Sequence, residues 1–161
     1  MHDQDFRTAH HEHGNGSERA GAPVRSVHSL DELASLVEER PQLHVRYSKG
    51  PDHDRTMTSR DHESGLSLPG LSVSPLGPAP WWTRPAIDWL ARQLCRYAHL
   101  QEKARDARVA WVLEGAEVGR GPDNEPLLRP WEAVAVLDDA VVQQARQLYE
   151  AHFDVGRDST N

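Results

Sequence analysis

Two apolar stretches late in the chain place the tightest limit on its fold. "VAWVLEG" (109–115) is an apolar strand pattern, and "WEAVAVL" (131–137) alternates as a strand with one buried face does. That alternation places Trp131, Ala133, Ala135 and Leu137 on one face. Between the two stretches lies "GRGPDNEPLL" (119–128), rich in the glycine, proline, aspartate and asparagine from which turns are built. We therefore expect two consecutive strands joined by a turn.

Three amphipathic patterns predict helices around these strands. "HSLDELASLVEERP" opens with Ser29 and Glu32 at capping-box spacing and ends at Pro41. "AIDWLARQLCRYAHLQE" (86–102) and the segment 139–153 both repeat apolar residues at helical spacing. The pattern therefore predicts three helices, one before and one after the two strands and one further towards the N-terminus.

Two shorter strands complete the expected fold. "LHVRYS" (43–48) alternates strictly, and "LPGLSVSPL" (68–76) contains a strand over 71–74 that Pro75 closes. The order helix, strand, strand, helix, strand, strand, helix is typical of an α+β domain with a mixed or mostly antiparallel sheet. We expect a single domain over 24–154, because a chain of 161 residues has the usual length of one domain.

Both ends of the chain are expected to be disordered. Residues 1–23 are polar, glycine-spotted and histidine-rich, and 155–161 form a short polar C-terminus. "HHEH" (10–13) could hold a metal ion, but a solvated tail offers no supporting shell of residues, so we expect no metal site. The single Cys95 excludes an intrachain disulfide and a cysteine cluster.

The charge of the chain narrows its possible partners. The net charge of -7 disfavours generic binding to nucleic acid or to anionic membrane. No secretory signal and no apolar run of spanning length is present, so we expect a soluble cytoplasmic protein. Arginine outnumbers lysine by 16 to 2, which is typical of a high-GC bacterial genome. The sequence does not indicate an oligomeric state.

A few polar residues in the strands and turns are candidates for chemistry. Arg46 lies in the middle of the 43–48 strand, on the face opposite its apolar residues. Ser72 and Ser74 lie two apart in a short strand and so share a face. Glu125 stands in the turn before the last strand, with Asp123 two residues earlier.

The order of these residues resembles the arginine–serine–glutamate class of ADP-ribosyltransferases, over roughly residues 43–137. The match departs from the family pattern at Tyr47, Val73 and Asp123, where glycine, threonine, and glutamate or glutamine are usual. The resemblance implies an enzyme that uses NAD⁺ on an unidentified acceptor.

The resemblance also implies roles for single residues. Arg46 would grip the pyrophosphate, with Tyr47 beside it at the cofactor. Ser72 and Ser74 would bind the ribose or orient the glutamate. Glu125 would be the catalytic carboxylate, stabilising the positive charge that develops on the sugar, and Asp123 would face the acceptor.

A more literal resemblance is to a bacterial family of uncharacterised proteins of unknown function. It runs through "SRDHESG", "LPGLSVSPL" and "GRGPDNEPL". This second resemblance implies no chemistry.

The alternative interpretation is a binding module without enzymatic activity. Taken singly, Arg46 is an ordinary strand arginine, the two serines mark a polar strand face, and Glu125 is a turn residue. Trp81 and Trp82 stand beside prolines in a loop and would present an aromatic surface to a partner. The other tryptophans, Trp89, Trp111 and Trp131, are expected in the core.

Overall fold

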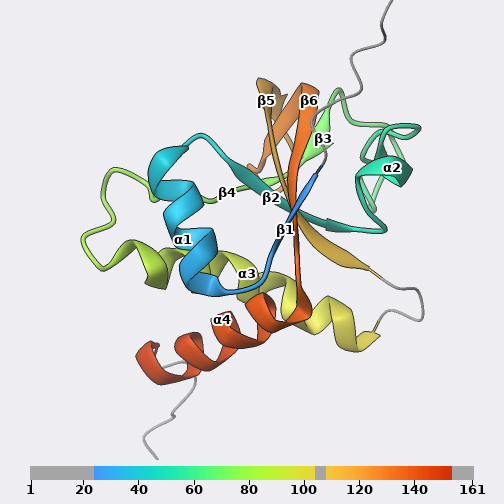
Figure 1. The fold of residues 1–161 in the computed structure, drawn as a ribbon. Helices are drawn as coiled ribbons and strands as arrows, with labels where there is room; N and C mark the ends of the chain where they lie inside the picture. The colour runs from blue at the N-terminus through green and yellow to red at the C-terminus, as the bar shows by residue number, and fades with distance from the viewer. Residues whose placement is uncertain (1–23, 104–107, 154–161) are drawn as a thin grey trace, which may run out of the picture.

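The computed structural model describes residues 24–103 and 108–153, with the side chains of 97–103 left out (Figure 1). The tails predicted at 1–23 and 155–161, and the histidines of 10–13, lie outside these residues. The elements in chain order are β1 (Arg25–Val27), α1 (Leu30–Glu39), β2 (His44–Ser48), α2 (Pro51–Asp54), β3 (Leu71–Ser72), β4 (Ser74–Pro75), α3 (Ala86–Lys103), β5 (Val109–Arg120), β6 (Pro126–Leu137) and α4 (Asp139–His152).

The predicted α+β class is confirmed. The described residues form one six-stranded sheet in the order β1-β6-β5-β2-β4, with β3 paired to β6 as well. Only β1 runs parallel to its neighbour; the other pairings are antiparallel. The three predicted helices are present as α1, α3 and α4, while the single turn of α2 and the short strand β1 are additional.

Helix α1 begins where the capping box predicts. The Ser29 side chain accepts a hydrogen bond from the Glu32 amide at 3.1 Å, so the first turn has a partner for one of its unpaired amides. The Glu32 carboxylate accepts a hydrogen bond from the His28 amide at 3.0 Å, rather than from the Ser29 amide that a capping box would use.

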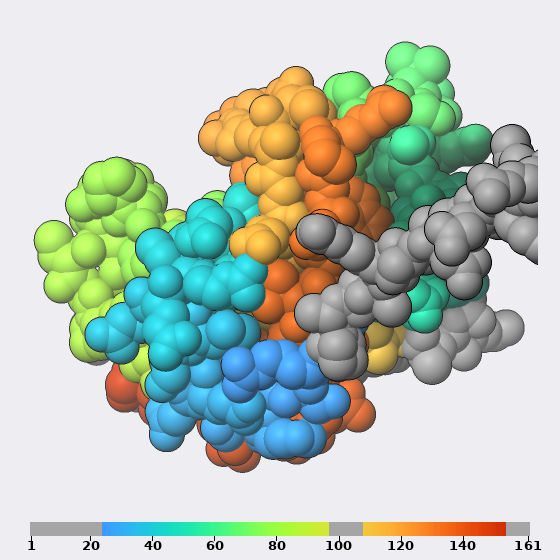
Figure 2. Space-filling view, turned by 45° about the horizontal axis from the view of Figure 1, so that its top comes forward, coloured from blue at the N-terminus to red at the C-terminus, as the bar shows by residue number. Residues whose placement is uncertain are grey.

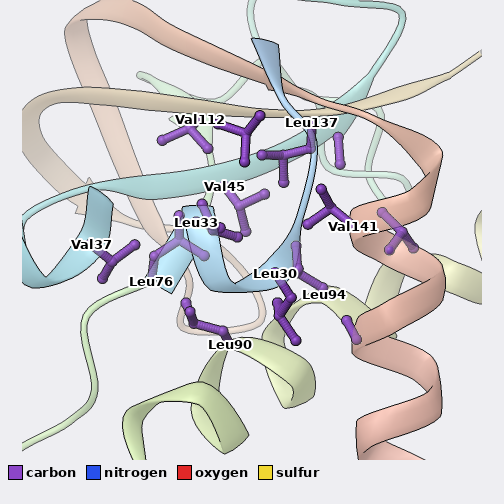
Figure 3. Close-up of a cluster of buried hydrophobic side chains, with 14 of the residues drawn as sticks. Leu30, Leu33, Val37, Val45, Leu76, Leu90, Leu94, Val112, Leu137 and Val141 are labelled. Carbon is purple, nitrogen blue, oxygen red and sulfur yellow. The ribbon is translucent and has the colours of Figure 1, made fainter. Parts of the chain in front are cut away.

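Helices α1, α3 and α4 cover one face of the sheet (Figure 1). The main core lies between that face and the helices (Figure 3). It includes Leu33 from α1, Val45 from β2, Leu94 from α3, Val112 from β5 and Val141 from α4. A smaller cluster lies on the other face and consists of Leu71, Val73, Trp111, Leu113 and Leu128.

The expected strand over 71–74 is wrong in detail, because it is split between two partners. Leu71 and Ser72 pair with β6, whereas Ser74 and Pro75 pair with β2 on the far side of β5. The amide of Val73, between them, donates to the carbonyl of Pro126 at 3.1 Å. This segment therefore connects the outer edges of β2 and β6 and curls the sheet around the smaller cluster.

The predicted alternation of the last strand is also wrong. Ala135 and Leu137 face the helices, but Trp131 and Ala133 pack on the smaller cluster. The cause is a register shift between the pairs Val112–Ala135 and Leu113–Ala133, where β6 has one more residue than β5. Such a bulge moves the following side chains to the opposite face.

The start of α4 is tied to β1. The Asp138 amide donates to the carbonyl of Val27 at 2.9 Å, and the Asp138 carboxylate contacts the ring of His28. That hydrogen bond and the attraction of the carboxylate raise the pKa of His28 above its ordinary value. Because the folded protein holds this proton more tightly than the unfolded chain, the pair stabilises the fold most fully below pH 6.5. The contribution is lost as pH rises through the raised pKa.

We expect the pKa of the His28 ring, measured by NMR, to lie above its ordinary value, and Asp138→Asn to lower it towards that value. Asp31→Asn is the control, because it removes a nearby carboxylate that does not contact the His28 ring. A His28 pKa that is unchanged by Asp138→Asn would show that the pair does not form.

Candidate functional site

Arg46 lies on the sheet face away from α1, α3 and α4 and is held at two atoms. Its Nε donates to Asp54 Oδ2 at 2.8 Å, and its Nη1 donates to the backbone carbonyl of Ser72 at 2.8 Å. Only 19% of its side chain is exposed. The guanidinium is thus fixed in orientation at the border between the interior and solvent.

Asp54 is the carboxylate that makes this burial possible, and sequence reasoning missed it. It lies at the end of α2, which starts at Pro51 after Gly50, whose φ of 119° suits glycine. Its Oδ2 also accepts from Ser48 Oγ at 2.5 Å, and Ser48 Oγ in turn accepts from the indole N–H of Trp111 at 3.0 Å. The ion pair is therefore anchored to the core beneath it. The Gly-Pro pair was the one sequence signal for this helix.

Ser72 uses its backbone and its side chain to connect the site. Its amide donates to Ser59 Oγ at 2.9 Å, and its carbonyl accepts from Arg46. Its hydroxyl donates to Glu125 Oε1 at 3.0 Å. One half-buried serine therefore holds both the arginine and the glutamate.

Glu125 is held at both carboxylate oxygens. While Oε1 accepts from Ser72, Oε2 accepts from the backbone amide of Asp123 at 2.9 Å. The turn itself is closed by Asn124 N to Gly121 O at 3.0 Å and Gly121 N to Glu125 O at 2.8 Å. Asn124 has the left-handed φ of 61° that asparagine tolerates in such turns. The stretch "GRGPDNEPLL" thus contains a hairpin turn, and the Glu125 carboxylate folds back onto the backbone of that turn.

The structure brings together three of the predicted residues, Arg46, Ser72 and Glu125, in one hydrogen-bonded chain. Asp123 joins them through its backbone amide, and its side chain is exposed.

Two predicted site residues lie elsewhere. Tyr47 was expected beside the cofactor, but it is 7% exposed and packs in the main core, because neighbouring residues of a strand point to opposite faces. Ser74 was expected to join Ser72. Instead it is buried on β4 opposite Val45, because the segment changes partner strand at Val73.

Trp81 and Trp82 lie in a second, separate region. They form edge-to-face contacts with each other and with Trp89, and Trp82 stacks on Phe153 after α4. Trp81 remains 67% exposed. The segment that carries them and the end of the β5–β6 hairpin form two different projections in the space-filling view (Figure 2). The two tryptophans therefore do not line the site of Arg46 and Glu125.

The remaining tryptophans agree with expectation in part. Trp89 and Trp111 are buried, as predicted. Trp131 is half-buried on the smaller cluster, 5.2 Å from Trp111 between ring centroids, with the guanidinium of Arg55 6.0 Å from its ring.

Two other titratable groups bear on possible chemistry. Burial raises the pKa of the Cys95 thiol to about 11, so the thiol is protonated at neutral pH and is a poor nucleophile. Burial lowers the pKa of His44, which shares its sheet face with Arg46.

No group of three histidine, cysteine or acidic side chains suited to a metal ion occurs among residues 24–103 and 108–153. Within the same residues, no helix combines the length and apolarity needed to cross a bilayer.

The chain belongs to a protein family whose function is unknown, described as "Family of unknown function (DUF6098)", which matches residues 20–159. This confirms the expectation of a family of unknown function. No curated protein and no solved structure matches the chain significantly.

The ion pair of Arg46 can be tested by removing its partner. Asp54→Ala leaves a largely buried guanidinium without a counter-charge, so we expect the free energy of unfolding to fall by about 3 kcal/mol. Asp52→Ala is the matched control in the same helix. Its side chain is fully exposed and lies 3.9 Å from Arg55, so its loss should change stability by less than about 0.5 kcal/mol. Urea denaturation measures both; equal losses would contradict the assigned role of Asp54.

Proposed function

We propose that this domain uses NAD⁺ to transfer an ADP-ribosyl group, with Glu125 as the catalytic carboxylate. The observation that supports this most directly is that Ser72 hydrogen-bonds both Arg46, through its carbonyl, and Glu125, through its hydroxyl. Ser72 thus links the Arg46 guanidinium, a group suited to binding an anion, to the Glu125 carboxylate. NAD⁺ would supply the ADP-ribosyl group, with neutral nicotinamide leaving with the electron pair of the broken bond.

Arg46 suits the diphosphate end of such a substrate. A guanidinium carries five N–H groups in one plane, which suits bidentate contact with phosphate. Among the described residues, Arg46 donates from Nε to Asp54 and from Nη1 to Ser72. These two bonds fix the plane of the guanidinium in advance, so that little side-chain entropy is lost on binding.

Glu125 suits the sugar end. When the bond between nicotinamide and the ribose breaks, positive charge develops on the sugar, and a negative carboxylate beside it lowers the barrier. The bonds from Ser72 and Asp123 hold the Glu125 carboxylate in place before substrate arrives. The acceptor atom then forms its bond to the sugar carbon and loses its proton. Asp123, exposed on the same turn, would face the acceptor.

The proposal is tested by titrating NAD⁺ calorimetrically and by measuring nicotinamide release. We expect the wild-type protein to bind NAD⁺ and to release nicotinamide. Glu125→Ala and Glu125→Gln should still bind NAD⁺ but release nicotinamide about 10²–10³-fold more slowly, because the transition state loses its charge partner.

Glu63→Gln is the matched control, because Glu63 is an exposed glutamate in a different loop. It should behave as wild type in both measurements. Absence of NAD⁺ binding by the wild-type protein would overturn the proposal.

The second candidate is a partner-binding module. The observation that favours it is the 67% exposure of Trp81 above a packed group of aromatic rings. Large exposed aromatic side chains are enriched at protein interfaces. A wild-type protein that fails to bind NAD⁺ would leave this surface as the better-supported function.

A further inference from the structure

Gly121 lies directly against the Glu125 carboxylate. A Cβ atom on Gly121 would lie 2.0 Å from Oε1, 2.3 Å from Cδ and 2.6 Å from Oε2 of Glu125. Real Cβ atoms essentially never approach other heavy atoms closer than 3.0 Å. The carboxylate therefore occupies the space that any side chain at position 121 would take.

The backbone conformation does not account for this glycine. Among the described glycines, positive φ occurs at Gly50 and Gly65 and not at Gly121. The obstacle to a side chain at 121 is therefore the glutamate itself. Because a carboxylate is the far end of a flexible side chain, Glu125 would move aside while the turn keeps its backbone bonds.

We infer that Gly121 is a positioning residue: by having no side chain, it lets the Glu125 carboxylate stay between the Ser72 hydroxyl and the Asp123 amide. An alanine at 121 would push the carboxylate away from both donors. The catalytic part of this inference rests on the proposed function, whereas the geometric part does not.

Gly119 is a matched control two residues earlier in the same hairpin. A Cβ atom there has no heavy atom within 4 Å, and its φ is not positive either. Both Gly→Ala changes reduce the freedom of the unfolded chain similarly, so their difference isolates the contact with Glu125.

Thermal unfolding without NAD⁺ tests the geometric part. We expect Gly121→Ala to lower Tm by about 2–4 °C relative to Gly119→Ala, because two hydrogen bonds are lost. In an E125A background the carboxylate is gone, so the two alanine variants should unfold at the same Tm. An equal Tm of both variants in the wild-type background, or an undiminished difference in the E125A background, would overturn the inference.

Nicotinamide release tests the catalytic part. We expect Gly121→Ala to lower kcat by about 10²-fold, because the carboxylate is misplaced, and to leave the KM for NAD⁺ within about twofold, because Arg46 is untouched. Gly119→Ala should match wild type. Equal activity of the two variants would overturn the role of Gly121 while the proposed function stands. If wild type itself releases no nicotinamide, the proposed function fails, and the Tm comparison still decides whether Gly121 positions Glu125.

Discussion

The backbone pairing of the segment from Leu71 to Pro75 is the constraint on which the rest of the site depends. Its two halves bond to β6 and to β2, which lie on opposite sides of β5. Because this one continuous segment pairs with both β2 and β6, it draws these two strands together. Ser72 stands next to the point of division, so groups from distant parts of the sheet come within reach of one residue.

The charges of the site are tolerated because each has a partner supplied by the fold. Moving an arginine and an aspartate out of water costs several kcal/mol per ion unless they pair closely and their remaining polar atoms are bonded. Asp54 and Arg46 meet this condition through Ser48 and the carbonyl of Ser72. Beneath them, the indole of Trp111 connects the pair to the smaller cluster. The polar network and the apolar packing are thus parts of one interior.

Sequence reasoning predicted best those elements whose signals are local. The capping box at Ser29 places the start of α1 because the bond it predicts is made within one turn. The full length of β5 could not be predicted, since its outer half is exposed and lacks an apolar pattern. The three-residue β1 is defined by its partner strand, and the bulge beside Ala133 is visible only as a break in register.

The same difference between local signals and distant partners applies to the residues of the site. The linear order of Arg46, Ser72 and Glu125 predicted that they belong together, and the structure joins them by hydrogen bonds. Asp54 could not be foreseen, because its pairing with Arg46 depends on how α2 folds back against β2. Ser74 lies apart from Ser72 because the segment changes partner strand between them: Ser72 pairs with Leu127 of β6, and Ser74 pairs with Val45 of β2. Strands β3 and β4 have two residues each, and short elements with few bonds open more readily than the core. Since Ser72 bonds both Arg46 and Glu125, one local opening of this segment would break both of these bonds together and separate the two residues from each other. The site is therefore expected to assemble and come apart as a unit, with an opening free energy below that of the whole domain.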